Sequence, residues 1–240
     1  MMPPQRRLDA VARHVLGGGT TLTPQGASSG EAFAVVEESY EDSLGRSVRV
    51  MQLRNNDSGE LAEVLLNTPG GQNRSTGSGS VGGLLLRTAG GELREVLPHR
   101  QPYVGGLMAP FANRIRHGSY SFGGQQHQLT KNWSEAETRM TTNGEHAIHG
   151  LLPTELDLVS WQSTEASAQL TLAASFDGSD PGYPFTINVA FTYTLDASGF
   201  SIGVSATNAS EAGEAAPFMV GWVSPATVWP RHFTQNNAAA

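Results

Sequence analysis

Asparagine and arginine stand side by side at Asn113 and Arg114, inside an apolar stretch bounded by glycine and proline at residues 106–118. The arginine side chain presents a planar fork of hydrogen-bond donors, and the asparagine amide offers both donors and an acceptor. Together they suit a ligand that carries many hydroxyl groups. Taken alone, the pair also fits a structural role, because such side chains often satisfy buried carbonyl groups in loops.

Histidine supplies a second kind of chemistry, at His149 in the run NGEHAIHG of residues 143–150. An imidazole exchanges protons near neutral pH, so His149 could act as a general acid or base, and a structural hydrogen bond is the alternative reading. The spacing of His146 and His149 could also suggest a metal site. However, the context is strand and loop rather than helix, and no third ligand is evident, so we expect no metal.

The segment around Asn113 and Arg114 resembles the signature of the aldose 1-epimerase family. Its FANRI core at residues 111–115 is followed, at the spacing of that family, by Gly118, Phe122, Gly124 and Leu129. Further resembling elements follow in the family's order: NGEHAIHG at 143–150, Trp161, DPGYPF at 180–185, TNAS at 207–210 and APFMVGW at 216–222. Several elements in one order are far more specific than any one of them. The resemblance covers roughly residues 60–222.

The resemblance implies a function. Members of the family interconvert the α and β anomers of a free aldose, by removing a proton from the C1 hydroxyl while another group protonates the ring oxygen. It implies that Asn113 and Arg114 contact sugar hydroxyls and that His149 is catalytic. No cofactor is implied, and the expected partner is an aldohexose such as glucose or galactose. A non-catalytic carbohydrate-binding module and an unrelated β-sandwich interaction domain are the alternatives.

After Trp222 the chain departs from the family's pattern. The family continues with a His-Pro-Tyr-Phe sequence that holds its usual general acid, whereas residues 223–226 read Val-Ser-Pro-Ala, and the flanks of His232 do not match. The family's general-base glutamate and a sugar-contacting aspartate come later in a longer chain. We therefore expect low activity, missing C-terminal strands, and a frame change, alternative splice or mispredicted gene end after Trp222. Exposed strand edges would make the isolated chain poorly soluble or oligomeric.

The elements that must position these residues are strands. From Ala32 onward apolar and polar residues alternate, which puts one set of side chains on each face of a sheet. The expected strands are residues 33–40, 47–56, 62–66, 84–86, 170–176, 185–195 and 200–206, with a hairpin at 120–129 around Gly123-Gly124. This predicts an all-β chain, and the resemblance implies a large antiparallel β-sandwich of the galactose mutarotase-like type.

Three regions follow from these patterns. Residues 1–31 are expected to be an N-terminal extension, helical or disordered, residues 32–222 an incomplete mutarotase-like sandwich, and residues 223–240 an irregular tail. The apolar helical face and the three arginines near the N-terminus leave two readings open, a frayed helix and an organelle transit peptide.

Composition excludes several function classes. The net charge of −7, from 15 basic and 22 acidic residues, argues against a nucleic-acid partner. The chain has no cysteine, so it can form neither disulfides nor thiolate metal sites. We find no apolar run long enough to span a bilayer and no secretory signal, so we expect no membrane partner and a cytoplasmic location.

Overall fold

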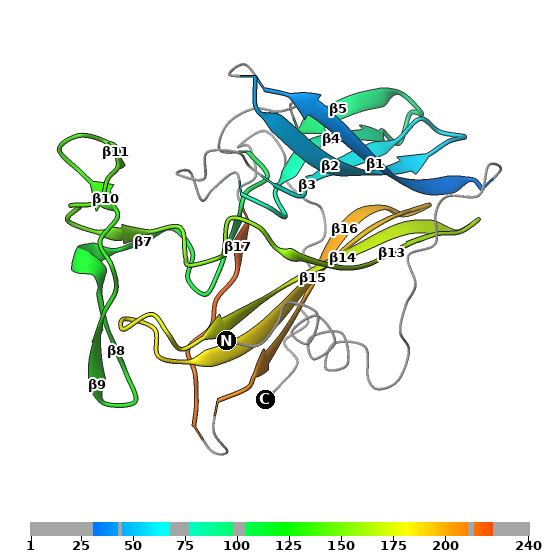
Figure 1. Cartoon of the computed structure of the whole chain (residues 1–240). Coiled ribbons are helices and arrows are strands. Elements are labelled where there is room, and N and C mark those ends of the chain that lie inside the picture. Colours follow the sequence, from blue (N-terminus) through cyan, green and yellow to red (C-terminus); the bar gives the residue numbers. More distant parts are fainter. Residues whose placement is uncertain (1–30, 43–44, 68–76, 98–103, 211–213, 223–240) are drawn as a thin grey trace.

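The computed structural model describes residues 31–42, 45–67, 77–97, 104–210 and 214–222. Nearly all regular structure within these residues is antiparallel β-strand, arranged as two large sheets and several two-stranded ladders (Figure 1). The predicted all-β fold class is therefore confirmed. No helix in the described part of the chain is long and apolar enough to cross a membrane.

The first large sheet has five strands in chain order: β1 (Phe33–Glu41), β2 (Ser47–Asn55), β3 (Leu61–Leu65), β4 (Val81–Arg87) and β5 (Leu93–Leu97). The bounds of β1, β2 and β3 agree with the predicted strands to within one residue at either end. Alternation explains this accuracy, since Met51 and Leu53 of β2 face the core between the sheets, while Val48 and Val50 are buried in a separate cluster on the other face.

The second large sheet has four strands: β13 (Asp157–Ser163), β14 (Ser167–Asp177), β15 (Thr186–Asp196) and β16 (Gly199–Asn208). The inward residues of β15 are Ile187, Val189, Phe191, Tyr193 and Leu195, and all five are buried. The register places Leu172 of β14 and Val204 of β16 on either side of Phe191. The predicted strands 170–176, 185–195 and 200–206 are confirmed.

The two large sheets pack against each other to form a sandwich. One hydrophobic cluster contains residues from both, such as Met51 and Leu53 of β2 with Leu170 and Phe191 of the second sheet. Tyr193 is fully buried among them, and its hydroxyl donates a hydrogen bond of 2.5 Å to the carbonyl oxygen of Gly79. Burial raises the pKa of this phenol far above its ordinary value, so the hydroxyl stays a donor.

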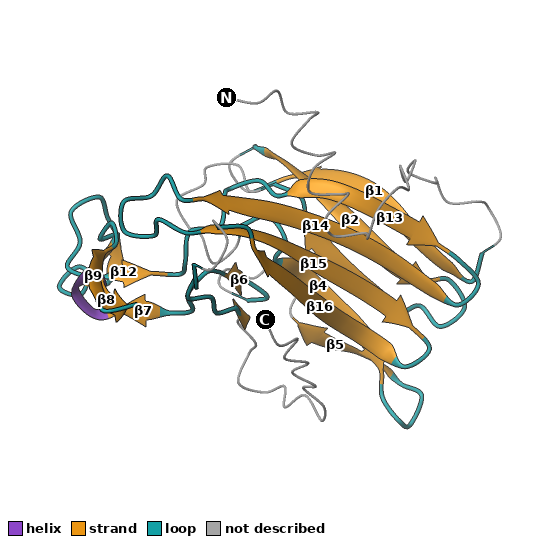
Figure 2. Ribbon diagram, turned by 90° about the horizontal axis from the view of Figure 1, so that it is seen from below, coloured by secondary structure: helices purple, strands orange, loops and turns teal. Residues whose placement is uncertain are grey.

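Outside the two large sheets the described residues form short strands, most of which gather at one end of the sandwich, with β6 between that end and the large sheets (Figure 2). They are β6 (Leu107–Met108), β7 (Arg114–Ile115), β8 (Ser119–Phe122), β9 (Gln125–Gln128), β10 (Trp133–Ser134), β11 (Arg139–Met140), β12 (Ala147–Ile148) and β17 (Gly221–Trp222), with the 3-10 turn η2 (Arg116–Gly118) after β7. The predicted hairpin is confirmed as β8 and β9, with Gly123 and Gly124 at positive φ in its turn.

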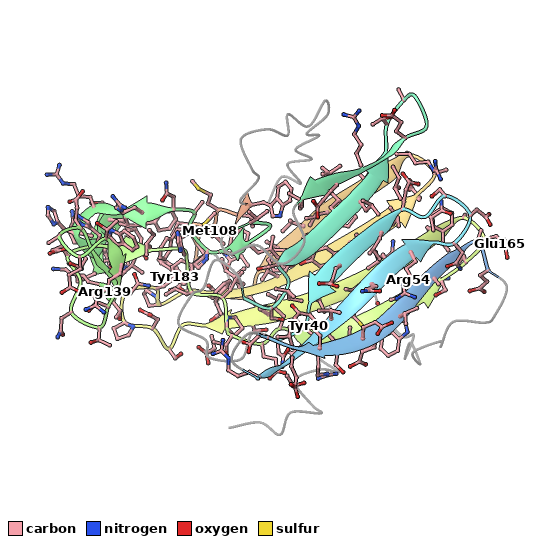
Figure 3. All side chains as sticks on the ribbon, turned by 90° about the horizontal axis from the view of Figure 1, so that it is seen from above. Tyr40, Arg54, Met108, Arg139, Glu165 and Tyr183 are labelled. Carbon is pink, nitrogen blue, oxygen red and sulfur yellow. The ribbon has the colours of Figure 1, made fainter. Side chains whose placement is uncertain are left out.

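The short ladders join the large sheets through a layer of aromatic and apolar side chains. In Figure 3, Met108 and Tyr183 lie where the two parts meet, and Arg139 lies at the outer end of the ladders. The hydroxyl of Tyr183 donates to the carbonyl oxygen of Pro217, and that of Tyr120 donates to Gly182. These bonds tie β8 and the segment before β17 to the loop that enters β15.

Two predicted regions lie outside the described residues. The N-terminal extension of residues 1–31 does so except for Glu31, and the irregular tail of residues 223–240 does so entirely.

Candidate functional site

The three predicted site residues meet at the end of one short ladder. β12 pairs with β7 so that Ile148 stands opposite Arg114. One step further along, the backbone N–H of His149 donates a hydrogen bond of 2.8 Å to the carbonyl oxygen of Asn113. Two segments far apart in the sequence therefore place Asn113, Arg114 and His149 side by side.

The backbone at this point is held in an unusual conformation. Asn113 has φ 55° and His149 has φ 68°, both in the left-handed region that L-residues seldom occupy. Asparagine tolerates this region, but a histidine there costs about 1–2 kcal/mol relative to the ordinary helical region. Such strain persists only where the surroundings fix it, and it is concentrated at functional sites.

The backbone conformation of His149 is fixed by the close packing of the next residue, Gly150. Its φ is 77°, and a Cβ at this position would lie 2.2 Å from the carbonyl oxygen of Ala109. The backbone of Leu151 also donates to that oxygen, at 2.7 Å. Only glycine fits this close approach. The close approach holds the segment of His149 against the segment that runs from Ala109 to Asn113.

His149 has the properties of a group able to exchange protons with a ligand. It is partly buried, and its Nδ1 atom is buried with no hydrogen-bond partner among the described residues. Burial lowers the pKa of the imidazole, and the positive charge of Arg114 lowers it further. Near neutral pH the ring is therefore uncharged, with one nitrogen able to accept a proton and the other able to donate one.

Arg114 is held in place while part of its guanidinium stays exposed. Its Cζ lies 5.3 Å from the ring centre of Trp133, a cation–π distance, and its Nη1 is 3.8 Å from Oε1 of Glu135. The side chain of Arg114 is 38% exposed, so it keeps free donors on the open side. The side chain of Asn113 is exposed as well.

Sequence reasoning missed the neighbours that hold the arginine and the backbone of η2. His146 is buried, and its Nδ1 accepts a hydrogen bond of 2.9 Å from the backbone N–H of His117. The proton is therefore on Nε2, which donates to Oε2 of Glu135 at 3.1 Å. This hydrogen bond is the main cause that lowers the pKa of Glu135, so the carboxylate stays charged beside Arg114.

These neighbours left no readable signal in the sequence. Trp133, Glu135 and His146 come together only because the segment before β12 bridges to β10, through an isolated pairing of Trp133 with His146. His146 was visible only as a possible metal partner of His149. In the structure both of its ring nitrogens have protein partners, Glu135 and the backbone of His117.

The Gly221-Trp222 element lies directly against the segment that carries Asn113. β17 pairs with β6 so that Gly221 stands opposite Met108, and a Cβ on Gly221 would lie 2.5 Å from Cβ of Ala112. The indole N–H of Trp222 donates to the carbonyl oxygen of Gly105 at 3.1 Å. Elements that resembled one family as separate strings are therefore neighbours in space.

Comparison with known families gives one clear match. The family model described as aldose 1-epimerase matches residues 52–224, which is most of the chain and includes Asn113, Arg114 and His149.

Individual relatives match over shorter stretches. The protein YihR of Escherichia coli (strain K12) is 31% identical over 132 residues, covering 52% of this chain and 38% of that protein. Galactose mutarotase of Sus scrofa is 30% identical over 105 residues, covering 44% of this chain and 27% of that protein. The chain thus matches less than half the length of these curated relatives.

A solved structure shares the fold. The galactose 1-epimerase from Lactobacillus acidophilus NCFM superposes with a TM-score of 0.50 and 21% sequence identity. The match covers 73% of this chain and 49% of that chain. It supports the sandwich architecture predicted above.

Proposed function

The chain belongs to the aldose 1-epimerase family, and from this premise we propose that the end of the β7–β12 ladder binds a free aldohexose, such as galactose or glucose, and catalyses exchange of its anomers. The observation that carries the proposal is the buried Nδ1 of His149, which has no hydrogen-bond partner among the described residues and lies beside two exposed polar side chains, Asn113 and Arg114. A buried polar atom without a partner is costly unless a ligand satisfies it.

The chemistry requires two proton transfers. One group takes the proton from the C1 hydroxyl, and the ring oxygen receives a proton as its bond to C1 breaks. The open-chain aldehyde then turns about the C1–C2 bond, and the reverse transfers close the ring on the other face. A neutral imidazole can take part in either transfer, and each well-placed acid or base contributes about 10²- to 10⁴-fold.

The charge of Arg114 supports this role. It favours the neutral form of His149, and it can stabilise negative charge that develops on a sugar oxygen. Asn113 and the free donors of Arg114 would fix the orientation of the ring through its hydroxyls. The residues after Trp222 do not follow the family's His-Pro-Tyr-Phe pattern, so we propose that exchange by this chain is slow.

The test is anomer exchange of galactose and glucose, measured by polarimetry with wild type and the His149→Asn variant. Asparagine accepts the positive φ at this position, so the variant removes the imidazole without disturbing the backbone. We expect the wild-type rate above the uncatalysed rate to fall at least tenfold in His149→Asn.

His127→Gln is the matched control, since His127 stacks on Tyr120 in the β8–β9 hairpin and the change leaves the site intact. Its exchange rate should equal that of wild type. Wild-type exchange no faster than the uncatalysed reaction would contradict the catalytic role, and equal rates in wild type and His149→Asn would contradict the role of His149.

A further inference from the structure

Strand β16 is the edge of the second large sheet, and within the described residues no strand pairs with it on the side away from β15. The four edge strands of the two large sheets differ in charge. β1 carries three glutamates, β5 carries Arg94 and Glu95, and β13 carries Asp157. β16 reads GFSIGVSATN and has no charged residue and no proline. Proteins commonly protect edges with such residues, so the sequence of β16 lacks this protection, and no strand of the described residues covers its outer side.

The inner face of the sheet continues onto β16, where Phe200 and Ile202 are partly buried against the core and residues 203–206 are exposed. Phe191 of β15 is 0% exposed, whereas Val204, its partner on the same face of β16, is 43% exposed. Ala206, opposite the fully buried Val189, is exposed too. Apolar side chains thus follow the edge that no strand of the described residues pairs with.

The sequence of β16 is self-complementary when two copies of the strand pair antiparallel. If two copies meet with Gly203 opposite the partner's Gly203, then Ile202 faces Val204, Ser201 faces Ser205 and Phe200 faces Ala206. Every apolar residue meets an apolar residue, and every serine meets a serine. A two-fold axis requires this kind of self-complementary surface.

The backbone geometry allows the same register. The N–H of Ala209 donates to the carbonyl of Thr186, so the odd-numbered residues of β16 direct their backbone groups toward β15. Alternation then directs the N–H and C=O groups of Phe200, Ile202, Val204 and Ala206 outward. In the register above these even-numbered residues face one another, and they would form about eight backbone hydrogen bonds between the copies.

Gly203 also fits this arrangement. Its φ is not in the left-handed region, and a Cβ would approach only Thr192, at 3.7 Å and 3.9 Å, which is ordinary contact. The packing within one chain therefore does not require glycine here, and a glycine inside a strand often marks the close approach of another backbone.

We propose that β16 is a dimerisation edge, at which two copies of this chain pair antiparallel about Gly203 and join their four-stranded sheets into one continuous sheet. The proposal is independent of sugar binding.

The test uses the absence of cysteine from the chain. In the proposed register the two Gly203 residues form a non-hydrogen-bonded pair, with Cα atoms about 4.5 Å apart, which suits a disulfide. Gly203→Cys should therefore give a covalent dimer under mild oxidation. Ser201→Cys alone should not, because it faces Ser205, but an equal mixture of Ser201→Cys and Ser205→Cys should.

A second measurement follows the oligomeric state without crosslinking. By analytical ultracentrifugation wild type should be dimeric, and Val204→Lys should weaken the dimer at least tenfold, since Val204 is exposed in the single chain. Leu93→Lys is the matched control on β5, where Leu93 is 39% exposed, and it should leave the dimer unchanged.

The proposal would be overturned if wild type were monomeric. It would also be overturned if Ser201→Cys, oxidised by itself, gave as much covalent dimer as Gly203→Cys. A monomer whose β16 amides exchange slowly with solvent would show instead that another part of the same chain covers the edge.

Discussion

At the scale of single residues, the sequence indicated three candidate site residues but not the residues that hold them in place. Asn113, Arg114 and His149 stand out by type and by family spacing, and the structure brings them together at one ladder end. Trp133 and Glu135 gave no signal, because their contacts with Arg114 depend on a pairing between segments that no periodicity marks.

The pKa of His149 is the sharpest property at this scale. Burial and the charge of Arg114 both favour the neutral ring, so the pKa should lie below the unperturbed value of about 6.5. Arg114→Gln should raise it, and Arg116→Gln, a matched change at an exposed arginine, should leave it unaltered. NMR titration of the imidazole protons measures all three values. A pKa at or above the ordinary value in wild type would contradict the described environment.

The lowered pKa of His149 also makes the stability of the fold depend on pH. Between the lowered folded pKa and the unfolded pKa the unfolded chain binds more protons, so stability rises with pH in this window. The contribution of His149 is fully present above about pH 6.5 and is lost as the pH falls toward the folded pKa. In His149→Asn this part of the pH dependence of unfolding should be absent.

At the scale of elements, the long strands were predictable and the short ladders were not. β14, β15 and β16 carry many alternating residues, and their bounds follow from the sequence. β6, β7, β10, β11, β12 and β17 have two residues each, which is too short for a period to appear. The β8–β9 hairpin was predictable because its two glycines mark the turn.

Gly150 is the residue on which the β7–β12 ladder depends most. Gly150→Ala would place a Cβ against the backbone of Ala109 and also strain a positive φ. Gly123→Ala is a matched control, since its φ is 60° and its Cβ would meet nothing within 4 Å. We expect Gly123→Ala to lower the free energy of unfolding by about 1 kcal/mol and Gly150→Ala by at least about 3 kcal/mol. Urea unfolding measures both, and equal losses would contradict the tight packing.

At the scale of the whole molecule, one core joins the two large sheets to the short ladders. The hydrophobic cluster that contains Leu170 and Phe191 also contains Phe111, Leu129 and Ala147 beside the site. A sandwich was predictable because alternating strands need a second layer to cover their apolar face. The position of the ladders at one end of it was not, since it depends on long loops.

A shared core predicts a single unfolding transition. Leu170→Ala should lower the free energy of unfolding by about 2–5 kcal/mol, because it empties a fully buried position. Far-UV circular dichroism and tryptophan fluorescence should report the same midpoint, since Trp133 and Trp222 lie near the site and Trp161 lies in β13. Two separate midpoints would show that the ladders and the sandwich fold independently.

Amide chemical shifts during titration with galactose and glucose show whether Asn113, Arg114 and His149 form one sugar site. We expect saturable shifts that centre on these three residues with at least one of the sugars. The shifts should disappear in Arg114→Ala but persist in Arg116→Ala. Saturable shifts that centre elsewhere on the molecule, or no shifts with either sugar, would rule out the proposed site.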